Sequence, residues 1–147
     1  MKKSTLLIIT VLVVALISCN KNTGDTMDSS MDMLPPIDTT KTTVVLKGRF
    51  ENGPFGTTSG KVSILKTGNR FQLRLDSFRV SSGPDLKVYI SKQRLPLDFY
   101  RVGSLKAFNG DQEYDLSIIP DFPEYSYVLI HCEKFNHLFG AAVLMKE

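Results

Sequence analysis

A two-residue hydrophobic period in the C-terminal two thirds of the chain most strongly constrains its fold. Apolar Phe71, Leu73 and Leu75 alternate strictly with polar Gln72 and Arg74. This alternation is typical of a β-strand that has one buried face and one face in water. We therefore predict that the three apolar side chains face a core and that the two polar side chains face solvent.

Six further segments of this kind follow one another, separated by clusters of Gly, Pro, Asn and Asp that favour turns. The seven expected strands cover residues 43–50, 61–66, 71–76, 86–90, 112–116, 125–132 and 139–145. Short strands at such spacings are typical of sandwiches and barrels. We predict an all-β domain over residues 44–147, a small antiparallel β-sandwich or barrel-like domain.

The N-terminus has a different pattern. Lys2 and Lys3 precede residues 6–17, in which only Thr10 is polar. As a helix this segment would be about 18 Å long, whereas a bilayer core is about 30 Å thick. It therefore fits the hydrophobic region of a secretory signal peptide better than a membrane span.

Residues 16–19 read Leu-Ile-Ser-Cys, which resembles a bacterial lipobox. This resemblance implies that residues 1–18 are a lipoprotein signal peptide and that the Cys19 thiol carries lipid. Two or three acyl chains give stable membrane anchoring where one does not. We predict an exported lipoprotein of the bacterial cell envelope, anchored in the membrane through Cys19.

Residues 19–43 contain the lipidated cysteine followed by a polar stretch without a sustained apolar period. Such a stretch buries too little apolar surface to offset the entropy of ordering it, so we interpret it as a flexible tether. Its Met27, Met31 and Met33 have thioethers that suit Cu(I). Because they lie among polar residues in a coil, we interpret them as part of the spacer.

Charge and residue counts exclude several functions. The formal net charge is +3, and no run of Lys or Arg exceeds two residues, so the chain lacks the basic face that nucleic-acid binding requires. It contains two histidines and no Gly-rich loop between a strand and a helix. These features do not support a hydrolase or a nucleotide-binding protein.

Cys132 has no partner for a disulfide once Cys19 is lipidated. An exported protein with one unpaired thiol is unusual, because that compartment favours disulfides. Two interpretations remain open: a buried small hydrophobic residue, or a redox thiol or ligand. Val128 and Ile130 lie at even spacing from Cys132, so we expect them to share its face of the strand and to make that face apolar.

His131 and His137 lie close to this cysteine in the sequence. Adjacent residues in a strand point to opposite faces, so His131 and Cys132 cannot easily bind one metal ion. A zinc site also needs three or four ligands. We predict no metal site here, and we expect His131 to be a surface or rim residue.

Blocks along the whole domain follow the order found in one known family. They cover residues 48–50, 58–62, 75–78, 83–91, 103–106, 110–114, 127–135 and 139–144. The most specific are Gly-Pro-Asp-Leu-Lys-Val-Tyr at residues 83–89 and the spacing of Cys132 and Phe135. With these blocks the chain resembles the electron-transfer DM-thirteen (DM13) domain.

The resemblance implies a small β-sandwich or barrel-like module of extracellular and envelope proteins. It also implies that the family's cysteine, here Cys132, acts in redox chemistry, as a free thiol or as a ligand to a group such as haem. Many relatives carry a histidine just before the Ser-Gly block. This chain has Phe55-Gly56 there, so it lacks that side chain.

Two functions follow from these observations. The first is a lipid-anchored electron-transfer module that acts through Cys132, is a component rather than an enzyme, and exchanges electrons with an envelope redox protein. The second is a non-catalytic adhesion or binding module in which Cys132 is a core residue. They differ in whether Cys132 lies in an open pocket or is sealed in the core.

Overall fold

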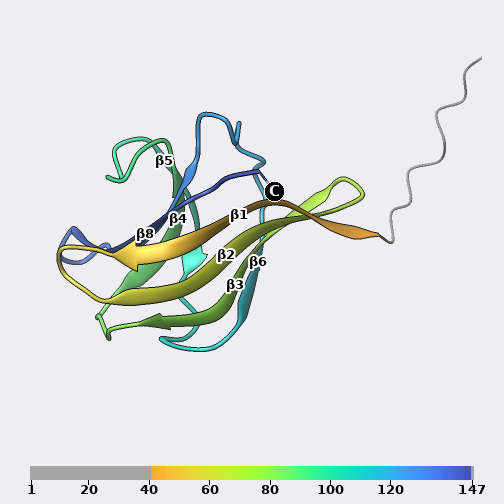
Figure 1. Ribbon diagram of the computed structural model, residues 1–147. Coiled ribbons are helices and arrows are strands. Elements are labelled where there is room, and N and C mark those ends of the chain that lie inside the picture. Colours follow the sequence, from red (N-terminus) through yellow and green to blue (C-terminus); the bar gives the residue numbers. More distant parts are fainter. Residues whose placement is uncertain (1–40, 147) are drawn as a thin grey trace, which may run out of the picture. The chain divides into compact units, whose positions relative to one another are not determined.

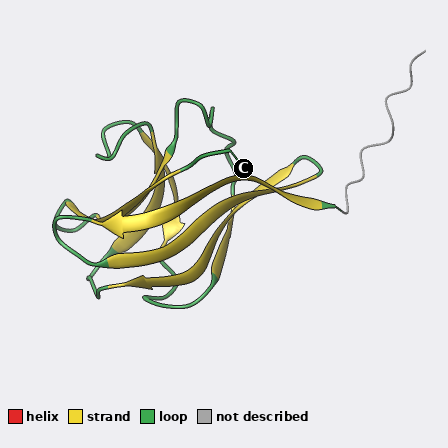
Figure 2. Ribbon diagram, viewed as in Figure 1, coloured by secondary structure: helices red, strands yellow, loops and turns green. Residues whose placement is uncertain are grey.

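β-Branched and aromatic runs separated by turns form eight strands in the computed structural model, which describes residues 41–146. Figure 2 shows strands and loops and no helix in this part of the chain. The strands are β1 (Thr42–Asn52), β2 (Thr58–Thr67), β3 (Arg70–Val80), β4 (Leu86–Ser91), β5 (Phe99–Ser104), β6 (Gln112–Asp115), β7 (Tyr127–Cys132) and β8 (His137–Val143). The predicted all-β fold is confirmed.

The N-terminal predictions fall on residues that the structure does not describe. The signal peptide at residues 1–18, the lipidation site Cys19 and the methionines Met27, Met31 and Met33 all lie outside the described residues. Within residues 41–146, no helix is both long enough and apolar enough to cross a membrane.

β1 begins before the expected domain boundary at Val44. Thr42 and Thr43 already pair with Thr67 and Lys66 at the end of β2. The ladder with β2 therefore includes the last two residues of the segment interpreted as tether.

The eight strands form one antiparallel sheet in the order β5-β4-β7-β8-β1-β2-β3-β6. β1 connects its two halves, because it pairs with β2 from Thr42 to Arg49 and with β8 from Phe50 to Asn52. β5 and β6 are the edge strands, and the Lys106 N–H between them donates to the Tyr114 hydroxyl at 3.1 Å. The sheet therefore forms a nearly closed barrel, with β1, β2 and β3 as long strands side by side in Figure 1.

The first half of the barrel consists of β1, β2, β3 and β6. In β3, Leu73 and Leu75 are fully buried, and Phe71 is partly buried against the core. Gln72 and Arg74 are half-buried and bind carboxylates of β6 and β3. The alternation predicted for this strand is confirmed.

The second half consists of β4, β5, β7 and β8, and its three inner strands are buried on both faces. Val88 and Ile130 belong to the barrel core, whereas Tyr89, Leu129 and Ala141 form a separate cluster on the outer face.

The connection between β4 and β5 lies over this outer face. The Arg94 guanidinium binds Glu51 of β1 at 2.6 Å and donates to the Asn52 carbonyl at 3.0 Å. Because β7 and β8 lie between β4 and β1, the connection must cross both strands to make these bonds. These bonds tie the Arg94 side chain to the outer face of the second half.

Strand direction alternates along the chain, so the connections divide between two ends of the barrel. We call one the Cys132 end; it contains the connections 53–57, 81–85, 105–111 and 133–136. We call the other the Thr42 end; it contains the connections 68–69, 92–98 and 116–126 and the residues that follow β8. The first described strand thus begins at the end opposite to Cys132.

Candidate redox site around Cys132

Cys132 is the last residue of β7 and is fully buried, with 0% of its surface exposed. It pairs with Leu86 of β4 and His137 of β8. Val128 and Ile130 belong to the same buried core, as their spacing predicts. The thiol is therefore sealed inside the barrel rather than placed in an open pocket.

The turn that follows Cys132 lies at the surface. The Glu133 N–H donates to the Asp85 carbonyl at 3.1 Å, which joins this turn to the connection before β4. Residues 133–136 are exposed, and Asn136 has a φ of +54°. The sealed sulfur therefore belongs to the residue directly before a solvent-facing turn. Asn136 in this turn adopts the left-handed conformation that few residue types tolerate.

His131 points to the other face of the sheet, as strand alternation predicts. The prediction that it is a surface or rim residue is wrong, because only 4% of it is exposed. Its ring lies 5.6 Å from the Tyr89 ring, and its Nδ1 has no hydrogen-bond partner. Burial lowers the pKa of His131, although a hydrogen bond that the ring donates to the Asn136 side chain raises it, so the ring favours the neutral form.

Tyr89 lies next to His131 on this outer face. Its hydroxyl donates to the Glu133 carboxylate at 2.6 Å, and that carboxylate also binds Arg101 at 3.3 Å. The Tyr89 ring stacks on Phe99 with a centroid distance of 4.3 Å. Burial, followed by the bond to Glu133, raises the pKa of Tyr89.

Sequence reasoning did not identify this outer-face cluster of Tyr89, Phe99, Arg101, His131 and Glu133. Its only signal in the sequence is that β4 contains a tyrosine inside an apolar run. The pairing of β4 with β7 brings Tyr89 and Glu133 together, although 44 positions separate them.

The His137 ring packs against an aromatic ring. It stacks on the Phe55 ring, and the two ring centroids are 3.7 Å apart. Phe55 thus has a packing role at the position where the resemblance led us to look for a histidine. Over residues 41–146, no group of three or more His, Cys, Asp and Glu side chains could hold a metal ion.

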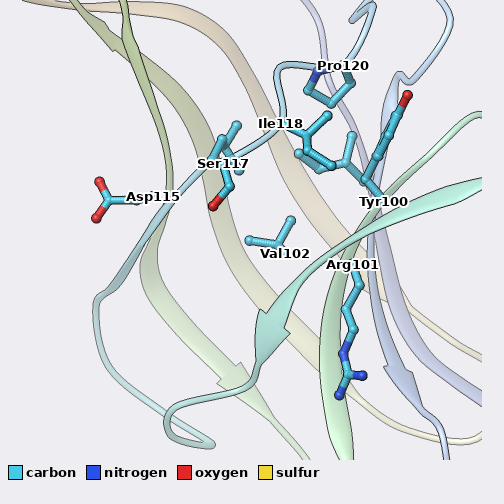
Figure 3. A pocket seen from close by; sticks show the side chains of 9 residues that line it. Tyr100, Arg101, Val102, Asp115, Ser117, Ile118 and Pro120 are labelled. Carbon is cyan, nitrogen blue, oxygen red and sulfur yellow. The ribbon is translucent and has the colours of Figure 1, made fainter.

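The pocket in Figure 3 lies between β5 and the segment after β6, where the barrel is not closed. It has a volume of about 90 Å³. Val102 and Ile118 lie beside the opening, and Arg101 points away from it. Cys132 does not line this pocket, which is too small for a porphyrin.

A haem ligated by Cys132 would need an open slot next to the sulfur. The sulfur instead packs in the apolar core, with 0% exposure. The residues around Cys132 in this conformation therefore do not fit a haem.

The family model "Electron transfer DM13" matches residues 49–144. The match begins within β1, ends just after β8 and includes Cys132. Comparisons with curated proteins and with solved structures give no match.

Proposed function

The chain belongs to the electron transfer DM13 family, and on this basis we propose that it is a lipid-anchored electron-transfer module of the cell envelope with Cys132 as its redox residue. The family match carries this proposal, because it extends over almost the whole barrel. Cys132 is the one cysteine of residues 41–146, so cysteine redox chemistry in this domain would use its thiol. Export and anchoring rest on the signal sequence and on Cys19.

The proposal requires the Cys132 end to open, because the closed barrel keeps reactants away from the sulfur. The 133–136 turn supports such an opening because it is exposed and directly follows Cys132. Lifting it would require the bonds of Glu133 to Asp85, Tyr89 and Arg101 to break. A partner that lifts this turn would uncover the thiol without separating the long strands β1, β2 and β3.

The partner's oxidant is a disulfide in this proposal. The Cys132 thiolate attacks one sulfur of that disulfide, a new sulfur–sulfur bond forms, and the partner's own sulfur–sulfur bond breaks. The second partner sulfur leaves as a thiolate and takes up the proton that Cys132 lost. The mixed disulfide then holds Cys132 in its oxidised form. A thiolate of a reduced donor dithiol attacks the Cys132 sulfur and releases the first partner as a dithiol, and the donor's second thiol then closes the donor disulfide and releases Cys132 as a thiol.

One observation favours a second function, a binding module without redox chemistry. Cys132 has 0% exposure and packs with Val128 and Ile130, which is how an inert structural cysteine is placed. In that case the thiol would react only when the whole barrel unfolds.

The two functions differ in how the native thiol reacts with an aromatic disulfide whose released thiolate absorbs visible light. The redox function predicts that the native full chain reacts more slowly than the urea-unfolded chain but faster than the barrel unfolds. Cys132→Ala should release no colour from the domain. A reaction no faster than global unfolding would favour the binding module.

A pair of turn variants locates the opening. Asn136→Val places a β-branched residue at a φ of +54°, so it should loosen the turn beside Cys132 and accelerate the reaction. Gly68→Val introduces the same strain at a φ of +57° in the hairpin of the opposite end. It should leave the reaction rate unchanged at equal global stability. Equal acceleration by both variants would contradict a local opening.

A further inference from the structure

An apolar groove with a volume of about 540 Å³ lies at the Thr42 end of the barrel. Its walls come from the start of β1, the start of β3, the connection before β7 and the residue after β8. Its apolar lining includes Val45, Phe71, Phe122 and Leu144. We call it the Thr42-end groove.

The groove continues the hydrophobic core to the surface. A β-bulge between Val44 and Leu46 inserts Val45 into β1, and Val45 packs against the core instead of facing water. The rings of Phe71 and Phe122 lie 5.9 Å apart and are partly buried against the same core. The groove therefore offers aromatic and aliphatic surface to a ligand that can reach it from solvent.

Two lysines add positive charge to this apolar lining. Lys66 and Lys146 line the groove, and both are exposed. The Lys66 ammonium lies 5.5 Å from the centre of the Phe71 ring. Among the described residues, no carboxylate forms an ion pair with either ammonium group. An apolar groove beside two exposed lysines suits an amphipathic anion with a long hydrocarbon chain.

The position of the groove indicates where such an anion would come from. Val45 follows the first strand residue, Thr42, by three positions, so the groove lies where the described chain begins. The sequence predicts that the residues between Cys19 and β1 form a flexible tether, and a coil of about 22 residues spans roughly 23–28 Å. With lipid on Cys19, this end of the barrel stays within reach of the membrane surface.

We propose that the Thr42-end groove binds an acyl chain of an anionic membrane lipid, with Lys66 and Lys146 at its headgroup. This inference rests on the proposed anchoring through Cys19. It assigns the groove a ligand and gives the domain one orientation, with the Thr42 end on the bilayer and the Cys132 end directed away from it.

The absence of tryptophan from the chain allows a direct test. Phe122→Trp places one fluorophore in the groove of the full chain, and Phe71→Trp provides a second probe site if the first variant does not fold. Each variant is reconstituted in phosphatidylglycerol vesicles whose acyl chains carry bromine, which quenches tryptophan on contact. We expect F122W to lose at least half of its emission relative to vesicles without bromine.

Two control variants separate the groove from mere closeness to the membrane. Leu97→Trp changes a residue in a connection at the same end of the barrel but outside the groove. Leu97 has 72% of its surface exposed. Phe55→Trp lies at the Cys132 end. Both should lose less than a tenth of their emission. Replacing phosphatidylglycerol with phosphatidylcholine, or adding Lys66→Glu and Lys146→Glu, should reduce quenching of F122W at least threefold.

Quenching of F122W that is absent, or equal to that of L97W, would overturn the inference. A groove that is covered by another protein surface would give this result. Flotation of the same vesicles shows separately whether the chain is anchored. Chains that float without quenching leave the anchoring intact and contradict only the groove, whereas chains that do not float contradict the anchoring as well.

Discussion

The two halves of the barrel bury their strands in different ways. In the first half, the outer face of β3 carries Arg74, which binds Asp76 at 2.5 Å and Glu113 at 3.4 Å. In the second half, the side chains on the outer face of β4 and β7 include the aromatic Tyr89 and the apolar Leu129, and both are almost fully buried. One half is a sheet with a wet face, and the other is a sheet covered on both sides.

This difference explains where chemistry can occur in the molecule. Polar groups on the wet face are solvated and contribute little to stability. Buried polar groups in the twice-covered half, such as the His131 ring and the Tyr89 hydroxyl, are removed from water, so each needs a partner or shifts its pKa. Cys132 and the outer-face cluster both belong to this second half.

The largest expected effect tests whether the second half is covered on its outer side. Leu129→Ala should lower the free energy of unfolding by about 2–5 kcal/mol, as much as Leu73→Ala in the core, because both side chains are fully buried. Gln72→Ala on the wet face should cost about 0.5 kcal/mol or less. Urea unfolding measures all three. A Leu129→Ala loss as small as that of Gln72→Ala would mean that water reaches the outer face.

Next in size is the cost of a hydroxyl at position 132. Cys132→Ser should destabilise the barrel by about 1–3 kcal/mol, because the serine hydroxyl would be buried among apolar side chains without an assured partner. Cys132→Ala removes the sulfur without adding a polar group and isolates the packing cost. Thermal or urea unfolding of both variants gives the difference. Serine tolerated at wild-type stability would indicate that solvent reaches this position.

A smaller effect compares two tyrosine–carboxylate hydrogen bonds. Tyr89→Phe removes the partly buried bond to Glu133, which should cost about 1.5 kcal/mol. Tyr125→Phe removes an exposed hydrogen bond, in which the Tyr125 hydroxyl lies 2.9 Å from the Asp98 carboxylate. This loss should cost about 0.5 kcal/mol. Urea unfolding that gives equal losses would remove the distinction between the two halves for polar contacts.

The smallest effect is a pH dependence that comes from His131. Burial holds its folded-state pKa below the ordinary value of 6.5. As the pH falls below 6.5, the unfolded chain therefore binds a proton that the folded chain does not, and stability decreases. His131→Gln should lose this part of the decrease between pH 7.5 and pH 5.5, whereas His137→Gln should keep it. Urea midpoints at both pH values provide the measurement, and identical slopes in all three proteins would contradict it.

The first half was the easier one to predict from sequence. A strand with one wet face, such as β3, shows its buried positions as a two-residue period. β7 was also predicted, because an apolar run of that length bounded by turns favours a covered strand. β5 (Phe99–Ser104) was not predicted: it pairs on one side only, and Arg101 and Gly103 interrupt any apolar alternation.

The site shows the same limit. The apolar surroundings of Cys132 could be inferred, because they come from its own strand. The burial of His131 could not, because the Tyr89 ring beside it comes from β4, a distant part of the chain. No local pattern encodes which strand pairs with β7.

The open seam between β5 and β6 has a consequence for amide hydrogen exchange. No ladder joins these two edge strands, so water can reach one side of each backbone there without breaking a strand pair. The backbone amides of β5 and β6 that point into the seam, away from the neighbouring strand, should exchange first. The amides of β7 should exchange last, at a rate close to that set by global unfolding, because β7 has a partner strand on each side. Protection would thus increase from the seam toward the middle of the second half, and Cys132 lies at the end of its most protected strand.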